Sequence, residues 1–154
     1  LWLFKDLGHH ILVCDYEEST HKDAFGNCIG SKYLMRAHSD IAQIINNSSF
    51  VFEFDRRLAY GKRKEHYTCY NLPVSQEFRD FIETNTEFVD DDNTGYTDIM
   101  ELCTDVCGAN ICVGYSNAQK KKKKISISAF QNTYEKMSNL LTSELKRFPL
   151  KEKE

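Results

Sequence analysis

The chain has 154 residues and a formal net charge of −3, and 41% of its residues are hydrophobic. This size and composition are typical of one globular domain rather than of a disordered chain, and we expect a single domain over residues 1–150. The negative charge gives no overall basic field for nucleic acid, and no apolar run approaches the roughly 18 residues that span a bilayer. We therefore expect neither nucleic acid nor a membrane among its partners.

The first half of the chain predicts two strands around one helix. Residues 10–15 (HILVCD) are a continuous apolar run, which predicts a strand covered on both faces. Apolar side chains three or four residues apart predict a helix over 32–46, closed by an Asn-Asn pair. Residues 50–54 (FVFEF) predict a second strand that ends at Asp55.

Two more strands are predicted in the second half. A polar turn at 61–64 leads into a third strand over 66–70. The acidic stretch 87–92 predicts a loop, and 110–115 (NICVGY) predicts a fourth, buried strand.

Two further helices follow from apolar periodicity. Ser75 is placed to cap a helix with an apolar face made by Phe78, Phe81 and Ile82. The last helix is predicted to continue until Pro149 stops it, because apolar residues step by three or four through Phe130, Tyr134, Met137, Leu141, Leu145 and Phe148. Strands that alternate with helices predict the α/β class, with a mixed or mainly parallel sheet and helices on both faces.

Polar residues follow three of the predicted strands. Glu17 and Glu18 come just after the first, Asp55 ends the second, and the loop 116–119 (SNAQ) follows the fourth. In open α/β sheets, ligands bind beyond the carboxyl ends of the strands. Carboxylates suit Zn²⁺ and similar ions, and a neighbouring glutamate can take a proton from a metal-bound water. The alternative is that the Glu-Glu pair is simply a solvated start of a loop.

Four segments, in order, resemble the C-terminal part of the catalytic domain of the zinc-dependent exopeptidases, the di-zinc aminopeptidases and carboxypeptidases. LVCDYEE resembles their strand ending in hydrophobic-Asp-x-Glu-Glu, and FVFEFDRR resembles their FEFDR strand. TGYTDIMELC resembles their Ser/Thr-Asp-Ile segment, and ICVGYSNAQ resembles their closing strand, VGYYNQHT. The resemblance covers about residues 8–117. It implies a phosphorylase/hydrolase-like α/β fold, two zinc ions and hydrolysis of peptide bonds.

The resemblance implies a role for each matching residue. Glu17 matches the general base, Glu18 a zinc ligand, and Asp55 the ligand of the second zinc. Asp98 matches a carboxylate that orients the ligands. Gln119 stands where the family has its last His ligand, and no His-x-Asp segment precedes Glu17 to supply the first His and the bridging Asp. Because the chain does not begin with Met, we expect it to be an excerpt or a truncated form.

Three interpretations of function remain open. The first is a metal-dependent peptide hydrolase of the aminopeptidase type, with a peptide as substrate. The second is a non-catalytic binding or structural module that keeps the exopeptidase fold. A degraded fragment without a selected function is the third. His21 and His38 are weaker candidates for a replacement ligand.

Other features favour structural explanations. The run 120–124 (KKKKK) predicts a solvated loop, because the net charge is negative and no aromatic residues interleave with it. Cys103, Cys107 and Cys112 lack a spaced fourth ligand and are expected to pack. We expect a cytoplasmic protein. A sheet that lacks its first strands would expose an apolar edge, which predicts aggregation or a homo-oligomer.

Overall fold

The computed structural model describes residues 9–12, 28–57, 67–70, 73–90, 97–116 and 124–150. In chain order the elements are α1 (Ile29–Ala37), α2 (Ser39–Asn47), β1 (Val51–Arg57), β2 (Tyr67–Cys69), α3 (Gln76–Thr86), β3 (Val89–Asp90), α4 (Ile99–Leu102), β4 (Gly108–Ser116), β5 (Lys124–Ile125) and α5 (Ile127–Thr142). No helix within these ranges is both long and apolar enough to cross a membrane.

The strands form one mixed sheet of order β1-β4-β2-β3, with β5 paired to β4. β1 runs parallel to β4 and β2 parallel to β3, whereas β2 and β5 are antiparallel to β4. The predicted α/β class with a mixed sheet is therefore confirmed. β1 and β3 are the first and last strands of this order. The homo-oligomer expected from an exposed sheet edge stays a prediction.

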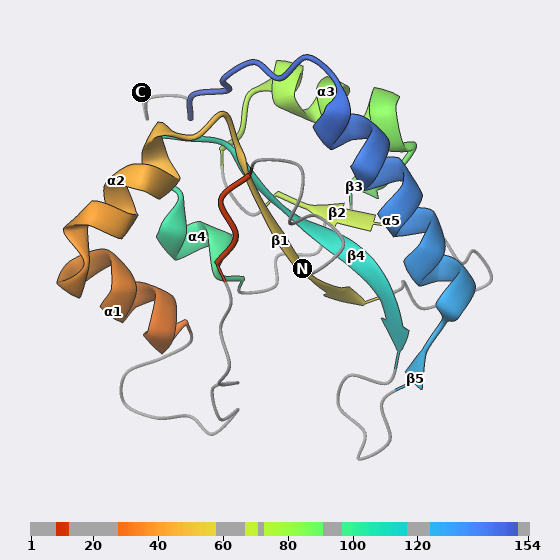
Figure 1. Cartoon of the computed structure of the whole chain (residues 1–154), viewed down its shortest axis with the longest axis horizontal. Helices are drawn as coiled ribbons and strands as arrows, with labels where there is room; N and C mark the ends of the chain where they lie inside the picture. Colours follow the sequence, from red (N-terminus) through yellow and green to blue (C-terminus); the bar gives the residue numbers. More distant parts are fainter. Residues whose placement is uncertain are drawn as a thin grey trace.

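Helices cover both faces of the sheet (Figure 1): α3 and α5 lie on one side, and α1, α2 and α4 lie on the other. β1 serves both faces because successive side chains of a strand point in opposite directions. Phe52 and Phe54 pack against the cluster that includes α3 and α5, whereas Val51 packs against the cluster that includes α4.

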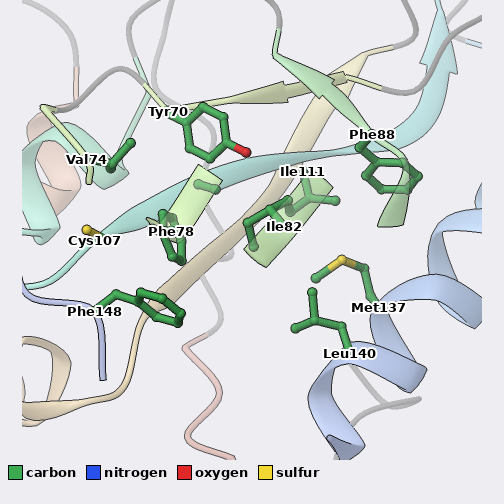
Figure 2. Packing of buried hydrophobic residues seen from close by; sticks show 11 residues of the cluster. Tyr70, Val74, Phe78, Ile82, Phe88, Cys107, Ile111, Met137, Leu140 and Phe148 are labelled. Atoms are coloured by element: carbon green, nitrogen blue, oxygen red, sulfur yellow. The ribbon is translucent and has the colours of Figure 1, made fainter. Parts of the chain in front are cut away.

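The larger core lies between the sheet and the pair α3 and α5 (Figure 2). Phe78 and Ile82 come from α3, Met137 and Leu140 from α5, and Ile111 from β4, and all five are buried. The predicted cap of α3 is confirmed, since the Ser75 hydroxyl accepts a hydrogen bond from the Phe78 N–H at 3.2 Å. The Phe78 N–H is shared between this hydroxyl and the Ser75 carbonyl, at 3.1 Å, which fixes the first turn of the helix.

The helix predicted over 32–46 is wrong as a single element, because the chain breaks at His38. His38 has φ −128° and ψ 72°, outside helical values, and separates α1 from α2. The break lets both helices present apolar side chains to the α4 cluster, with Leu34 coming from α1 and Ile45 from α2. Periodicity alone cannot detect such a break, because the two short helices keep the same spacing.

The strand predicted over 10–15 is not found in its described part. Residues 9–12 are not in a strand, and 13–15 lie outside the described residues. Ile11 and Leu12 are 39% and 44% exposed. A strand covered on both faces would bury these side chains, so the prediction is wrong for the described part of the run.

The last helix ends earlier than predicted, at Thr142 rather than near Pro149. The hydroxyls of Thr142 and Ser143 donate to carbonyls of the last turn, an alternative to continuing the helix that such residues offer. Phe148 nevertheless reaches the core, because its N–H donates to the Ser49 carbonyl and its carbonyl accepts from the Cys107 N–H. Tertiary pairing replaces the helix over this stretch.

The loop predicted over 87–92 is also corrected in part, because Val89–Asp90 form β3. This short strand pairs with β2 directly after α3. A two-residue strand carries too little alternation to be recognised from sequence.

Asn46 joins α2 to the segment that leads into β4. Its amide donates to the Ala42 and Leu102 carbonyls, both at 3.0 Å, and its side-chain oxygen accepts from the N–H groups of Thr104 and Asp105 at 2.8 and 2.9 Å. The Asn46 side chain is buried, and its bond to the Leu102 carbonyl is buried as well.

Asn46→Ala should therefore lower the free energy of unfolding by about 1–3 kcal/mol, because one buried and three partly buried hydrogen bonds to the backbone are lost together. Urea denaturation followed by circular dichroism measures the change. Asn47→Ala, at the exposed neighbouring position, is the matched control and should stay within about 0.5 kcal/mol of the parent protein. Equal midpoints for the two variants would contradict a structural role for Asn46.

Candidate functional site

Three carboxyl groups lie in the region where α4 begins beside the β1–β4 pair. Glu53 and Asp55 come from β1, and Asp98 is the N-cap residue of α4. The charges of both Asp98 and Asp55 act on Glu53 and raise its pKa, although burial is the larger cause. Sequence spacing alone would not join Asp98 to the other two. The parallel pairing of β1 with β4 and the packing of α4 beside them bring it there.

Glu53 is the innermost carboxyl of the three. One of its oxygens, Oε2, accepts a hydrogen bond from the Thr97 hydroxyl and another, at 3.2 Å, from the Ile99 N–H at the start of α4. Thr97 in turn accepts a bond of 2.9 Å from the Asn110 amide. Burial raises the pKa of Glu53 to about 7, against the lowering effect of the two hydrogen bonds it accepts.

Asp98 stands at the start of α4 as its N-cap residue. Its Oδ1 accepts a bond of 2.6 Å from the Ser31 hydroxyl, and it forms no side-chain bond to the N–H groups of α4. Ser31 is buried near the start of α1. The Asp98 carboxylate therefore ties α1 to α4 instead of capping its own helix.

Asp55 does not end its strand as predicted, because β1 continues to Arg57. Asp55 is exposed, while its main chain is held on both sides. Its N–H donates to the Asn110 side-chain oxygen, and its carbonyl accepts from the Tyr115 hydroxyl, both at 3.2 Å. An exposed carboxylate on a fixed backbone is suited to meet a ligand.

Among the described residues, no other predicted site residue lies with Asp55 and Asp98 around Glu53. Glu17, Glu18, His21 and Gln119, and most of the lysine run, lie outside the described residues. His38 is exposed at the break between α1 and α2. Within the described ranges, no three or more His, Cys, Asp or Glu side chains are grouped so as to hold a metal ion.

The cysteines pack as predicted. Cys103, Cys107 and Cys112 are all buried. Burial raises the pKa of the Cys103 thiol to about 12, with a smaller contribution from Cys107 beside it. A thiol with such a pKa remains protonated at neutral pH and is a poor metal ligand and nucleophile.

Sequence reasoning missed Glu53, Thr97 and Asn110, which form the inner part of the site. The available signal was polarity inside apolar strands: Glu53 interrupts FVFEF, and Asn110 opens the run NICVGY. A buried polar side chain in a sheet needs a hydrogen-bond partner, so each such residue in the sequence predicts a second polar group beside it. The identity of that partner depends on the tertiary fold.

Comparison with known proteins identifies no relative: no family model, no curated protein and no solved structure matches the chain.

The raised pKa of Glu53 predicts a pH-dependent stability. Because the folded-state pKa of about 7 lies above the ordinary value of 4.5, the folded state binds more protons between these pH values. The contribution of Glu53 to the free energy of unfolding should therefore be fully present below pH 4.5, and about 3 kcal/mol should be lost as the pH rises through 7. Glu53→Gln keeps the shape and the accepting oxygen without the charge, and should remove this decline.

Urea unfolding at pH 4.5 and pH 8 measures the effect as the difference between the two proteins. Glu83→Gln, at an exposed position on α3, is the matched control and should keep the decline of the parent. A decline of equal size in the Glu53→Gln variant would show that Glu53 is not its source.

Proposed function

We propose that this chain is a metal-dependent peptide hydrolase of the aminopeptidase type, built on a zinc-exopeptidase fold. One observation supports this most. Asp55 and Asp98, the two described residues to which the resemblance gives a role, both act electrostatically on the same buried carboxyl group, Glu53.

The chemistry of these two carboxylates is compatible with zinc. Asp55 is exposed and its backbone is fixed, so its oxygens can serve as one zinc ligand. Asp98 is held by Ser31, and suits the role of a carboxylate that orients a ligand. Glu18 would be the second ligand by the resemblance. Bound zinc would supply a Lewis acid and lower the pKa of water.

The protein's own contribution is binding and proton transfer. Glu17 would accept a proton from the attacking water and return it to the leaving amine, as a general base and then a general acid. The substrate would be a peptide.

The alternative is a non-catalytic binding or structural module with the same fold. Gln119 favours it, because a neutral amide oxygen replaces the imidazole that the family uses on zinc. The two functions differ in one measurable property, which is whether zinc binding depends on Asp55.

Calorimetric zinc titration of the metal-stripped protein tests the proposal. The parent chain should bind zinc, and Asp55→Ala and Glu18→Ala should each weaken binding by more than the ~10–100-fold typical for loss of a residue that merely supports a ligand. Asp40→Ala, which removes an exposed carboxylate from α2, is the matched control and should bind like the parent.

If zinc binds, cleavage of an aminoacyl p-nitroanilide by the zinc-loaded protein follows as the second test. Zinc binding that Asp55→Ala leaves unchanged would contradict the proposal and favour the non-catalytic module. The same holds for a parent protein that binds no zinc.

A further inference from the structure

The segment that follows α5 crosses from the α5 side of the molecule to the α2 side (Figure 1). We call residues 143–150 the latch. Within this range Phe148 alone is buried, Leu145 and Leu150 are half-buried, and the other side chains are exposed. A segment held by one aromatic anchor between exposed residues makes few apolar contacts, which is typical of parts of a protein that open on their own.

The anchor fills a slot lined by three aromatic rings. The Phe148 ring centroid lies 5.0 Å from that of Phe81 and 5.2 Å from that of Phe78, both on α3. It lies 6.2 Å from the ring centroid of Phe50, directly before β1. Figure 2 shows the Phe148 ring next to Phe78. We call Phe50, Phe78 and Phe81 the aromatic slot.

The rings of the aromatic slot also contact one another. The Phe50 centroid lies 5.7 Å from that of Phe81 and 6.2 Å from that of Phe78. Phe78 is fully buried in the core that α3 shares with α5 and the sheet. The lining of the slot therefore has support of its own, which does not come from Phe148.

The main chain of the latch pairs with residues that lead into two strands. The Phe148 N–H donates to the Ser49 carbonyl at 2.9 Å, and its carbonyl accepts from the Cys107 N–H at 2.8 Å. The Leu150 N–H donates to the Asp105 carbonyl at 3.2 Å. Ser49 precedes β1, and Asp105 and Cys107 precede β4. Extended peptides bind to sheets in this way, with main-chain hydrogen bonds for affinity and a pocket for one side chain.

Two cationic side chains of the latch add contacts on either side of the anchor. The Lys146 Nζ lies 5.0 Å from the Phe148 ring centroid and forms an ion pair with Glu77 of α3. The Arg147 guanidinium donates to the Asn46 carbonyl at 2.9 Å. All these contacts come from residues 146–150, so a separate peptide with the same sequence can make them too.

We propose that the latch is an exchangeable ligand of the aromatic slot. It opens without unfolding of the sheet, and the same segment of a second copy of this chain can replace it. α5 ends at Thr142, so the tether to Phe148 is short. A short tether holds a ligand at an effective concentration of about millimolar, so a chain's own latch should occupy the slot at micromolar protein concentration. This inference is independent of the proposed function, because it uses neither Asp55 nor zinc.

Native-state hydrogen exchange of the parent chain tests the opening. After correction for intrinsic rates, the amides of Phe148, Leu150 and Cys107, which bond in or to the latch, should exchange at least about tenfold faster than the Met137 amide inside α5. Low urea should raise the Met137 rate and leave the latch rates unchanged, because local opening exposes little surface. If all four amides exchange at one rate with one urea dependence, the latch opens only with the whole domain and the inference fails.

A fluorescein-labelled peptide of residues 143–150, SELKRFPL, tests replacement of the latch. Full-length Phe148→Ala should bind this peptide at least about tenfold more tightly than the parent, whose own latch competes for the slot. Phe88→Ala is the matched control, because it removes another buried phenylalanine of the same core and leaves the latch intact. It should bind the peptide as weakly as the parent. Fluorescence anisotropy measures the affinities, and circular dichroism checks that both variants fold.

Two results of this titration would overturn the inference. One is equal peptide affinity for Phe148→Ala and the parent. The other is binding that persists when the peptide itself carries Phe148→Ala. If the full-length Phe148→Ala variant does not fold, the hydrogen exchange and light scattering of the parent decide instead.

Light scattering after size exclusion tests the second copy as occupant. The parent should be monomeric at about 10 μM, and a dimer should appear as its concentration approaches about 1 mM, near the effective concentration of the tethered latch. Excess unlabelled SELKRFPL peptide should dissociate this dimer. A parent that stays monomeric at about 1 mM, or a dimer that the peptide leaves intact, would overturn exchange between copies.

Discussion

The parallel pairing of β1 with β4 is the constraint on which the rest of the structure depends. β4 is the strand to which β1, β2 and β5 all pair, so it organises the sheet. Its buried side chains alternate between the two helical layers: Ile111 meets the core with α3 and α5, while Asn110 faces the start of α4. Because β1 pairs in parallel with this strand, Glu53 lies opposite Asn110 and accepts a hydrogen bond from the first turn of α4.

A carboxyl group inside this arrangement has a cost that its surroundings only partly offset. Desolvation raises the free energy of the charged form of Glu53, and the nearby charges of Asp98 and Asp55 act in the same direction. The hydroxyl of Thr97 and the N–H of Ile99 oppose them. The balance leaves the pKa of Glu53 near neutrality, and it makes the polar network a cooperative unit in which each member depends on the others.

Side-chain hydrogen bonds in and outside this network link elements that are distant in sequence. Ser31 joins α1 to Asp98, Asn110 joins Thr97 to the backbone of β1, and Asn46 joins α2 to the segment before β4. The C-terminal segment adds Phe148 to the core and pairs beside Cys107. These polar connections select one relative placement of the helices, whereas apolar contacts alone are less directional.

The sequence by itself determined the α/β class, the strands containing 51–54 and 111–115, the capped helix after Ser75, and the packing of the cysteines. It did so because these features depend on local periodicity, on side-chain volume and, for the helix, on the hydroxyl of its N-cap residue Ser75. It did not determine the break at His38 or the end of the last helix at Thr142, where tertiary contacts overrode a continuous apolar spacing.

For the candidate site, sequence motifs singled out Asp55 and Asp98 but not the residues that surround them. Glu53, Thr97 and Asn110 come from three separate segments and acquire a common role only when β1, β4 and α4 pack together. The register shift between Glu53 and Arg56 of β1 is likewise a property of the pairing between two strands, and neither strand carries it alone. A single sequence records which polar groups exist, while the tertiary structure decides which of them meet, because burial and hydrogen bonding between distant segments arise only on folding.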